Sequence, residues 1–296
     1  MMARAAPRAE PPTACPACGA GGARSSPTAF ADPLLACPEC GHRWVADPRR
    51  VPGAAFYDHL HQSDLINPLP EAARREMLDE RLRLIEQWRA PGRLLDVGCG
   101  DGAFLARAEA RGWTTVGLET SPEAAARARA AARGEVIVAP LERAALPGEL
   151  DAVTFWDCLE HLVDPAAALR QVGPRLRPGA VVAITMPNAA GAEARLWGPR
   201  WPYLDLARYG HLHHFTPRSL RHLLGRDAAP GRVDVTTYGS VDLRYVPALA
   251  PLARGPGGPW ALDKASGVLA RVSRPARLGS TLLVRAQAGD GPRPAA

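Results

Sequence analysis

The residues best suited to bind a ligand lie in the segment LLDVGCGDGAFL, which spans positions 94–105. Its apolar start is typical of a buried parallel strand, and the residues from Ala103 onward have helical composition. Gly98, Gly100 and Gly102 alternate with other residues between these two parts. Because glycine has no Cβ atom, the backbone can turn sharply there and approach a ligand closely. We therefore predict a strand–turn–helix site whose free N–H groups face the ligand.

An acidic residue follows the glycine turn at the spacing expected for a ribose-binding carboxylate. Positions 113–118 predict a second strand, and Glu119 ends it, 19 residues after Gly100. A carboxylate at this place can accept hydrogen bonds from both hydroxyls of a ribose. The segment departs from the dinucleotide fingerprint because its third glycine comes one residue early. A plain βαβ unit with a surface glutamate is the alternative interpretation.

Asp96, Gly98 and Gly100 together resemble the D-x-G-x-G motif of the class I S-adenosylmethionine-dependent methyltransferases. The resemblance implies an α/β fold, with a Rossmann-like, mostly parallel seven-stranded sheet and helices on both faces. It implies that the turn surrounds the methionine part of the cofactor, that Glu119 holds the ribose and that the adenine lies near Leu141. The cofactor-binding residues expected from it are Asp96, Gly98, Cys99, Gly100, Asp101, Glu119, Leu141 and Asp157.

Later motifs point to one branch of this family. The run DCLEHL begins at Asp157, Asp164-Pro165 follows it, and HLHHFTP begins at His211. These motifs, with Arg177-Pro178-Gly179, resemble a branch that includes the quinone-precursor O-methyltransferases. Further strands are expected at 135–139, 151–156, 181–186, 233–238 and 281–286. Helices are expected at 71–90, 122–133, 217–224 and 261–272, and another starts at Pro165 and is broken at Pro174.

Histidines are the candidate bases, because an imidazole with a pKa near neutrality can deprotonate a phenol or an alcohol. His161 follows the fourth strand, and the aromatic-rich segment 189–215 ends in three histidines. We expect residues 211–214 to line the acceptor pocket, with His161, His214 and His213 as the catalytic candidates. The alternative is that these histidines only hold loops through hydrogen bonds. A metal bound by the three late histidines is disfavoured, since no carboxylate is suitably spaced.

Four cysteines form a second centre. Cys15 and Cys18 make one C-x-x-C-G pair, and Cys37 and Cys40 make another, with 18 residues between them. Two such pairs complete a tetrahedral four-sulfur Zn²⁺ site, and four protein ligands leave no open position for catalysis. We therefore predict a structural zinc ribbon. Disulfides and a redox C-x-x-C are the alternatives, and both fit the pattern less well.

Charge and composition disfavour proteins that bind nucleic acid and proteins that span a membrane. The net charge of +6 comes from scattered arginines, since Lys264 is the single lysine, and this pattern disfavours a nucleic-acid partner. Neither a run of 18 apolar residues nor a signal-peptide pattern is present, so we expect a cytoplasmic protein without a membrane span. The expected division is a disordered start (1–13), the ribbon (14–46), a connector (47–70), the methyltransferase domain (71–287) and a disordered tail (288–296).

The sequence favours methyl transfer, preferably to oxygen, on a small-molecule or glycan- or lipid-linked acceptor. The alternatives are an RNA methyltransferase that uses the ribbon for recognition and a non-catalytic cofactor-binding protein. Calorimetry with the cofactor tests the non-catalytic alternative, and salt-sensitive RNA binding would indicate an RNA methyltransferase. The oligomeric state is not predicted.

Overall fold

The computed structural model describes residues 14–47, 50–62, 71–227, 230–238, 265 and 279–289. The predicted disordered start and nearly all of the predicted helix over 261–272 lie outside these residues, as does the end of the predicted connector.

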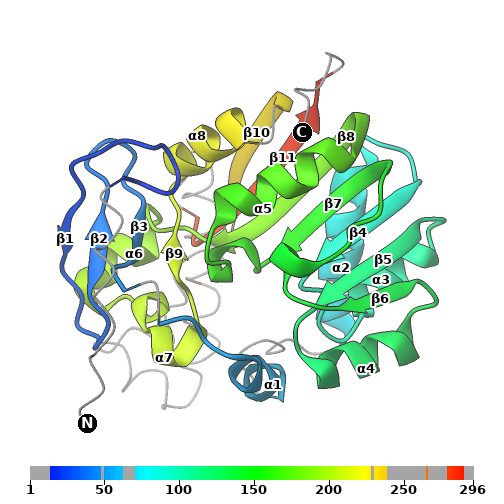
Figure 1. The fold of residues 1–296 in the computed structure, drawn as a ribbon, viewed down its shortest axis with the longest axis horizontal. Coiled ribbons are helices and arrows are strands. Elements are labelled where there is room, and N and C mark those ends of the chain that lie inside the picture. The colour runs from blue at the N-terminus through cyan, green and yellow to red at the C-terminus, as the bar shows by residue number, and fades with distance from the viewer. Residues whose placement is uncertain are drawn as a thin grey trace, which may run out of the picture.

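Seven strands of the described residues form one sheet, in the order β10-β11-β8-β7-β4-β5-β6 (Figure 1). The five strands from β8 to β6 are parallel, whereas β11 runs antiparallel to both β8 and β10. This is the Rossmann-like, mostly parallel sheet that the sequence predicts. The strands are β4 (Arg93–Val97), β5 (Thr114–Glu119), β6 (Glu135–Val138), β7 (Leu150–Trp156), β8 (Leu176–Pro187), β10 (Pro230–Tyr238) and β11 (Thr281–Ala288).

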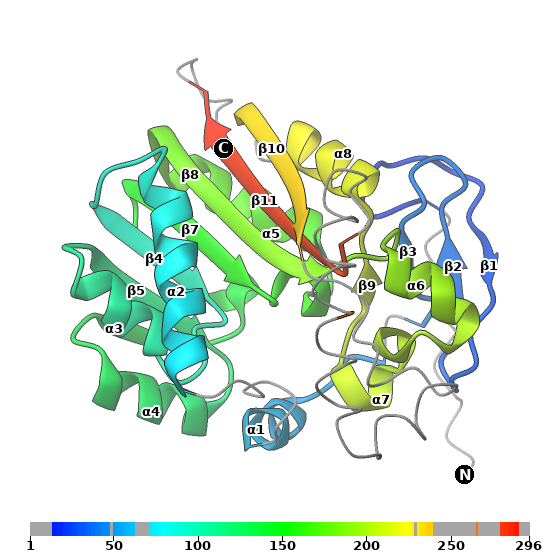
Figure 2. The same cartoon turned by 180° about the vertical axis from the view of Figure 1, so that it is seen from behind.

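Helices cover both faces of this sheet, as predicted. Figure 2 shows α2 (Glu71–Glu86), α3 (Ala103–Glu109) and α4 (Pro122–Ala131) along one side. Their buried side chains, such as Leu82 and Leu105, pack in one apolar cluster. The opposite face carries α5 (Pro165–Val172) and α8 (Pro217–Asp227), which contribute to a second cluster.

The strand order changes direction at β4. The chain runs from β4 outward to β5 and β6, and then crosses to β7 on the other side of β4. Ligands of open α/β sheets bind at such a switch point, outside the carboxyl ends of the strands. The glycine turn after β4, Glu119 at the end of β5 and Asp157 after β7 therefore meet at one edge.

A second, four-stranded sheet contains the cysteine-rich segment. Its order is β1-β2-β3-β9, and every pairing is antiparallel. The sequence places a domain boundary at residue 46, but this sheet crosses it, because β9 comes from the histidine-rich segment far along the chain. The strands are β1 (Arg24–Ser26), β2 (Leu34–Ala36), β3 (Arg43–Val45) and β9 (His213–His214).

Several boundaries differ from the prediction. Arg177-Pro178-Gly179, expected to precede the fifth strand, lies within β8, where Gly179 has φ 72° and the pairing with β7 shifts. The expected connector contains the helix α1 (Ala54–Gln62). The segment 189–215 folds into short helices before β9, namely α6 (Ala192–Trp197), η4 (Gly198–Arg200), η5 (Pro202–Leu204) and α7 (Leu206–Tyr209). Among the described residues, every helix is too short or too polar to span a lipid bilayer.

Candidate active site

The turn after β4 needs its glycines for packing within the protein. Gly98, Gly100 and Gly102 have φ values of 76°, 56° and 78°, a region that residues with a side chain rarely adopt. A Cβ atom on Gly98 would lie 2.8 Å from Sγ of Cys158, and one on Gly102 would lie 2.7 Å from Cα of Ala128. The turn therefore packs so closely against Cys158 and Ala128 that a side chain at Gly98 or Gly102 would clash.

The expectation of free N–H groups does not hold for three residues of this turn. The N–H groups of Gly98 and Cys99 donate to the carbonyl of Leu118, at 2.7 and 3.1 Å. The N–H of Gly100 donates to Oε2 of Glu119, at 2.9 Å. The turn is thus fixed to β5 by its own hydrogen bonds, and a ligand would meet a preorganised surface.

Glu119 joins three backbone groups at the end of β5. Besides Gly100, its carboxylate accepts from the N–H groups of Thr120 and Ser121, at 2.8 and 2.9 Å. Its side chain is 4% exposed, so its orientation is fixed. Oε1 accepts two of these hydrogen bonds and Oε2 accepts one, so a ligand would share this carboxylate with the backbone.

A buried charged network lies beneath the turn. Asp96 accepts a 2.6 Å hydrogen bond from Oγ1 of Thr154, and burial raises the pKa of Asp96 to about 7. Arg81 forms a 3.0 Å ion pair with Asp157, and its guanidinium lies over the ring of Trp156. Although α2 is rich in charged residues, the Arg81 side chain is only 12% exposed.

These residues line one cleft of about 1190 Å³. It contains every predicted cofactor-binding residue, including Asp101 and Leu141, which begins the short helix η1 (Leu141–Arg143). Nη2 of Arg74, which also lines the cleft, donates to both carboxylate oxygens of Asp101, at 2.8 and 2.7 Å. The other part of the cleft is lined by aromatic residues and histidines, namely Tyr57, His161, Trp197, Tyr203, Tyr209 and His211.

His161 is held in one tautomer. It ends the short helix η2 (Leu159–His161), and its Nδ1 lies 3.1 Å from the carbonyl oxygen of Gly210. Because a carbonyl only accepts, Nδ1 carries the proton and Nε2 is the basic nitrogen. The rings of Tyr57 and His211 contact His161 edge to face, with centroids 5.8 and 4.7 Å away.

Glu160 is a buried carboxyl group in the cleft wall. It is 1% exposed, and within the described residues neither carboxyl oxygen has a hydrogen-bond partner. Burial, and secondly Asp157, raises the pKa of Glu160 well above its usual value. Its Oε1 lies 3.9 Å from Nε2 of His211. Glu160, His161 and His211 offer ligand atoms within 4.8 Å of one another and could hold a metal ion.

His213 and His214 lie outside the cleft. They form β9, paired with Arg43 and Trp44 of β3, and are 5% and 2% exposed. Burial lowers the pKa of His213 to about 4 and that of His214 to about 3, so both are neutral and weakly basic at pH 7. Of the histidines expected to line the acceptor pocket within 211–214, His211 therefore lines the cleft, whereas the expectation must be corrected for His213 and His214.

The four ribbon cysteines converge as the spacing predicts. Sγ of Cys15 lies 3.6 Å from that of Cys40, and Sγ of Cys18 lies 3.6 Å from that of Cys37. These distances are far from a disulfide bond of about 2.05 Å and close to the ~3.8 Å edge of a tetrahedron with Zn–S bonds of ~2.3 Å. All four Sγ atoms lie within 4.8 Å of one another. The donor set therefore fits Zn²⁺.

Electrostatics also prepare this cluster for a cation. The hydrogen bond from Cys40 lowers the pKa of Cys15 to about 5, so the cluster holds a thiolate at neutral pH. The remaining cysteines behave differently, because burial raises the pKa of Cys99 and of Cys158. They are therefore uncharged thiols, and Cys99 packs against Gly117.

The cleft-wall residues that sequence analysis missed include Tyr57, Arg74, Arg81 and Glu160. Glu160 stands within the DCLEHL run and could have been found there. The two arginines show no periodic signal, because α2 is rich in charge all along its length. Tyr57 lies in a helix that the sequence suggests only by a cluster of aromatic residues.

Helices cover both faces of the Rossmann-like sheet, a glycine turn follows its central strand β4, and an acidic residue ends the next strand, β5. Together these features define a fold that binds a nucleotide-type cofactor. Comparison with protein families is more specific. The model of the methyltransferase domain family matches residues 70–228, which is more than half of the chain, and the chain belongs to this family.

Individual relatives match parts of the chain. The ubiquinone biosynthesis O-methyltransferase of Thiobacillus denitrificans is 33% identical over 148 residues, which are 47% of this chain and 55% of that protein. The protein of the same name from Xanthomonas campestris is 36% identical over 115 residues, 36% of this chain and 48% of that protein. The chain thus spans about half the length of the curated relatives that it matches.

Solved structures share the fold. A SAM-dependent methyltransferase from Archaeoglobus fulgidus superposes with a TM-score of 0.51 at 19% identity, over 72% of this chain and 94% of that one. The plantazolicin methyltransferase BpumL, solved with a triazolic desmethylPZN analog and SAH, gives a TM-score of 0.54 at 16% identity, over 81% of this chain and 96% of that one. At these identities the likeness shows the fold.

Proposed function

We propose that this protein transfers the methyl group of S-adenosylmethionine to an oxygen atom of a small-molecule acceptor. The observation that carries the proposal is one cleft that joins the D-x-G-x-G turn and Glu119 to His161, whose Nδ1 donates to the carbonyl of Gly210 and so leaves Nε2 as the basic nitrogen. The relatives named ubiquinone biosynthesis O-methyltransferase support oxygen as the acceptor atom.

Each side of the cleft has its own role. Glu119 holds the ribose hydroxyls, the turn at Gly98 and Gly100 packs against the methionine part, and the adenine lies near Leu141. The bound cofactor supplies an electrophilic methyl group. His161 takes the proton of the acceptor hydroxyl through Nε2, and the enclosed wall positions this oxygen for in-line attack.

The rim supports an acceptor with an apolar part. Val51 and Val163 line the cleft and are 39% and 50% exposed, so they present apolar surface at its mouth. A lipid-linked or other carrier-linked acceptor fits this mouth, whereas a bare sugar would leave it uncovered.

Zn²⁺ is proposed as a structural ion held by Cys15, Cys18, Cys37 and Cys40, with no part in methyl transfer. Because the ribbon needs free thiolates, we place the protein in the reducing cytoplasm.

The direct test combines binding and turnover. Calorimetry should give saturable binding of SAM and SAH, and a panel of phenols and prenylated phenols should yield methyl ethers by mass spectrometry. A panel of amines and RNA serves as the comparison. Methylation of amines or RNA in preference to every hydroxyl acceptor would contradict the proposal.

Replacing Glu119 by alanine should weaken the binding of SAH by tenfold or more, about 1.4 kcal/mol per decade. The carboxylate makes charge-assisted hydrogen bonds to the ribose, each contributing roughly 1.5–3 kcal/mol. Calorimetry measures the affinity, and circular dichroism checks that the variant is folded. Glu135→Ala, an exposed glutamate at the start of β6, is the matched control. An unchanged affinity in Glu119→Ala would mean that the ribose binds elsewhere.

A further inference from the structure

We propose that the cysteine ribbon positions the acceptor side of the cleft, and that His42 is a positioning residue that acts through His213. The inference rests on the proposed function, since that function makes the wall around His161 and His211 the acceptor site. It goes further by giving the ribbon a role in this wall.

A backbone route links the ribbon to the wall. In β3, Trp44 pairs with His213, and the N–H of Val45 donates to the carbonyl of Leu212, at 2.9 Å. The N–H of Leu212 in turn donates to the carbonyl of Glu160, also at 2.9 Å. Leu212 therefore lies between the ribbon and the turn that carries Glu160 and His161, and it directly follows His211.

A side-chain route runs beside it. Nε2 of His42 lies 3.1 Å from Nδ1 of His213, and Nε2 of His213 lies 3.3 Å from the carbonyl oxygen of Val163. Since a carbonyl only accepts, His213 donates from Nε2 and accepts at Nδ1 from His42. The relay ends two residues after His161.

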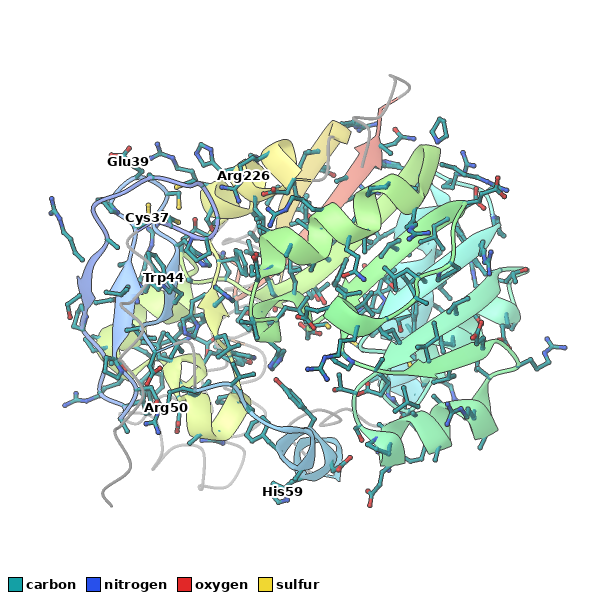
Figure 3. All side chains as sticks on the ribbon, viewed as in Figure 1. Cys37, Glu39, Trp44, Arg50, His59 and Arg226 are labelled. Carbon is teal, nitrogen blue, oxygen red and sulfur yellow. The ribbon has the colours of Figure 1, made fainter. Side chains whose placement is uncertain are left out.

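The metal-binding knuckles themselves contact the same region. The hydroxyl of Thr216 donates to the carbonyl of Cys40, at 2.8 Å, and Nη2 of Arg226 donates to the carbonyl of Pro16, at 3.1 Å. Figure 3 shows Arg226 of α8 beside the end of the ribbon that carries Cys37. His42 also packs on Phe215, with ring centroids 4.5 Å apart. A bound ion that fixes the knuckles would thus fix the segment that directly follows β9.

The cofactor side is held by other contacts. The glycine turn is fixed by Leu118 and Glu119, which belong to the large sheet. The two halves of the cleft should therefore respond differently when the ribbon is loosened. The acceptor wall should become mobile, while the cofactor site should keep its shape.

Hydrogen exchange measured by mass spectrometry on the full chain tests this without knowledge of the acceptor. The samples are the zinc-loaded protein, the chelator-treated protein and His42→Phe, which keeps an aromatic ring but loses the hydrogen bond to His213. We expect amides at 159–163 and 211–214 to exchange about tenfold faster or more in the last two samples. Amides at 93–121 should be unchanged, and the Kd for SAH should stay within about twofold.

The control is Arg24→Ala, on the exposed edge strand β1 of the same ribbon, which should behave as wild type. If chelation unfolds the whole chain, His42→Phe with its zinc retained decides the question. Unchanged exchange at 159–163 and 211–214 in that variant would overturn the proposal, and so would equally faster exchange at 93–121. Failure to find a methylated acceptor would instead refute the proposed function and leave the exchange pattern intact.

Discussion

Replacing His161 by alanine is expected to lower turnover by about 10²- to 10⁴-fold, while the affinity for SAH stays the same. The reason is the fixed tautomer: Nδ1 donates to Gly210, so Nε2 is the nitrogen able to take a proton from an acceptor in the cleft. The measurement is steady-state turnover with a phenolic or alcoholic acceptor that the wild-type protein methylates, together with calorimetry of SAH.

Two variants separate base catalysis from support of the fold. His161→Gln can still donate to Gly210 but has no basic nitrogen, so it should be as slow as the alanine variant. His222→Ala, which removes an exposed histidine of α8, should be fully active. Raising the pH should partly restore the slow variants, by about tenfold per pH unit at most, because more of the acceptor is ionised and the base is needed less. Near-native turnover in both His161 variants would show that the enzyme works by positioning alone.

His214 provides the complementary expectation. The sequence offers it as an equal candidate, but it is buried in β9 and has no surface in the cleft. We expect His214→Ala to lower the melting temperature. Turnover per folded active site should stay at the wild-type level. His211 and His214 are close in sequence, but only His211 lines the cleft, so their spacing does not indicate a shared role.

The cofactor half of the site is predictable from sequence because its determinants are local. Asp96, Gly98 and Gly100 act within one strand–turn unit, and Glu119 ends the adjacent strand. Parallel strands align their carboxyl ends at one edge of the sheet, so spacing along the chain becomes proximity in space. The hydrogen bonds that occupy the N–H groups of the turn come from Leu118 and Glu119, and the sequence pattern carries no sign of them.

The acceptor half is less predictable because its contacts are long-range. His42 and His213 are 171 positions apart, and their pairing depends on a strand of only two residues. Such a strand has no periodic signal, and its histidines resemble a catalytic cluster when read in one dimension. Arg81 is similar, since only the fold shows that its face of α2 turns toward Asp157.

Replacing Cys37 by serine is expected to remove the bound metal and to unfold the ribbon. Wild-type protein should contain about one zinc per chain, because four thiolates fill one tetrahedral site. Structural Zn²⁺ contributes an apparent ~10–16 kcal/mol in zinc-finger peptides, so losing one ligand should cost much of this segment's stability. The measurements are elemental analysis and limited proteolysis within residues 14–47.

Cys158→Ser is the matched control for this variant, since Cys158 packs beneath Gly98 in the cofactor turn and lies outside the four-cysteine cluster. It should keep its zinc and leave the ribbon resistant to protease. The alternative chemistry gives a different result: in a disulfide-linked ribbon, chelators would have no effect and a reductant would release new thiols. Wild-type protein without metal, in which Cys15, Cys18, Cys37 and Cys40 are all alkylated in the folded state, would disprove the zinc site. Because β9 completes the sheet of this ribbon, that outcome would also leave the acceptor wall without the metal that we infer to fix it.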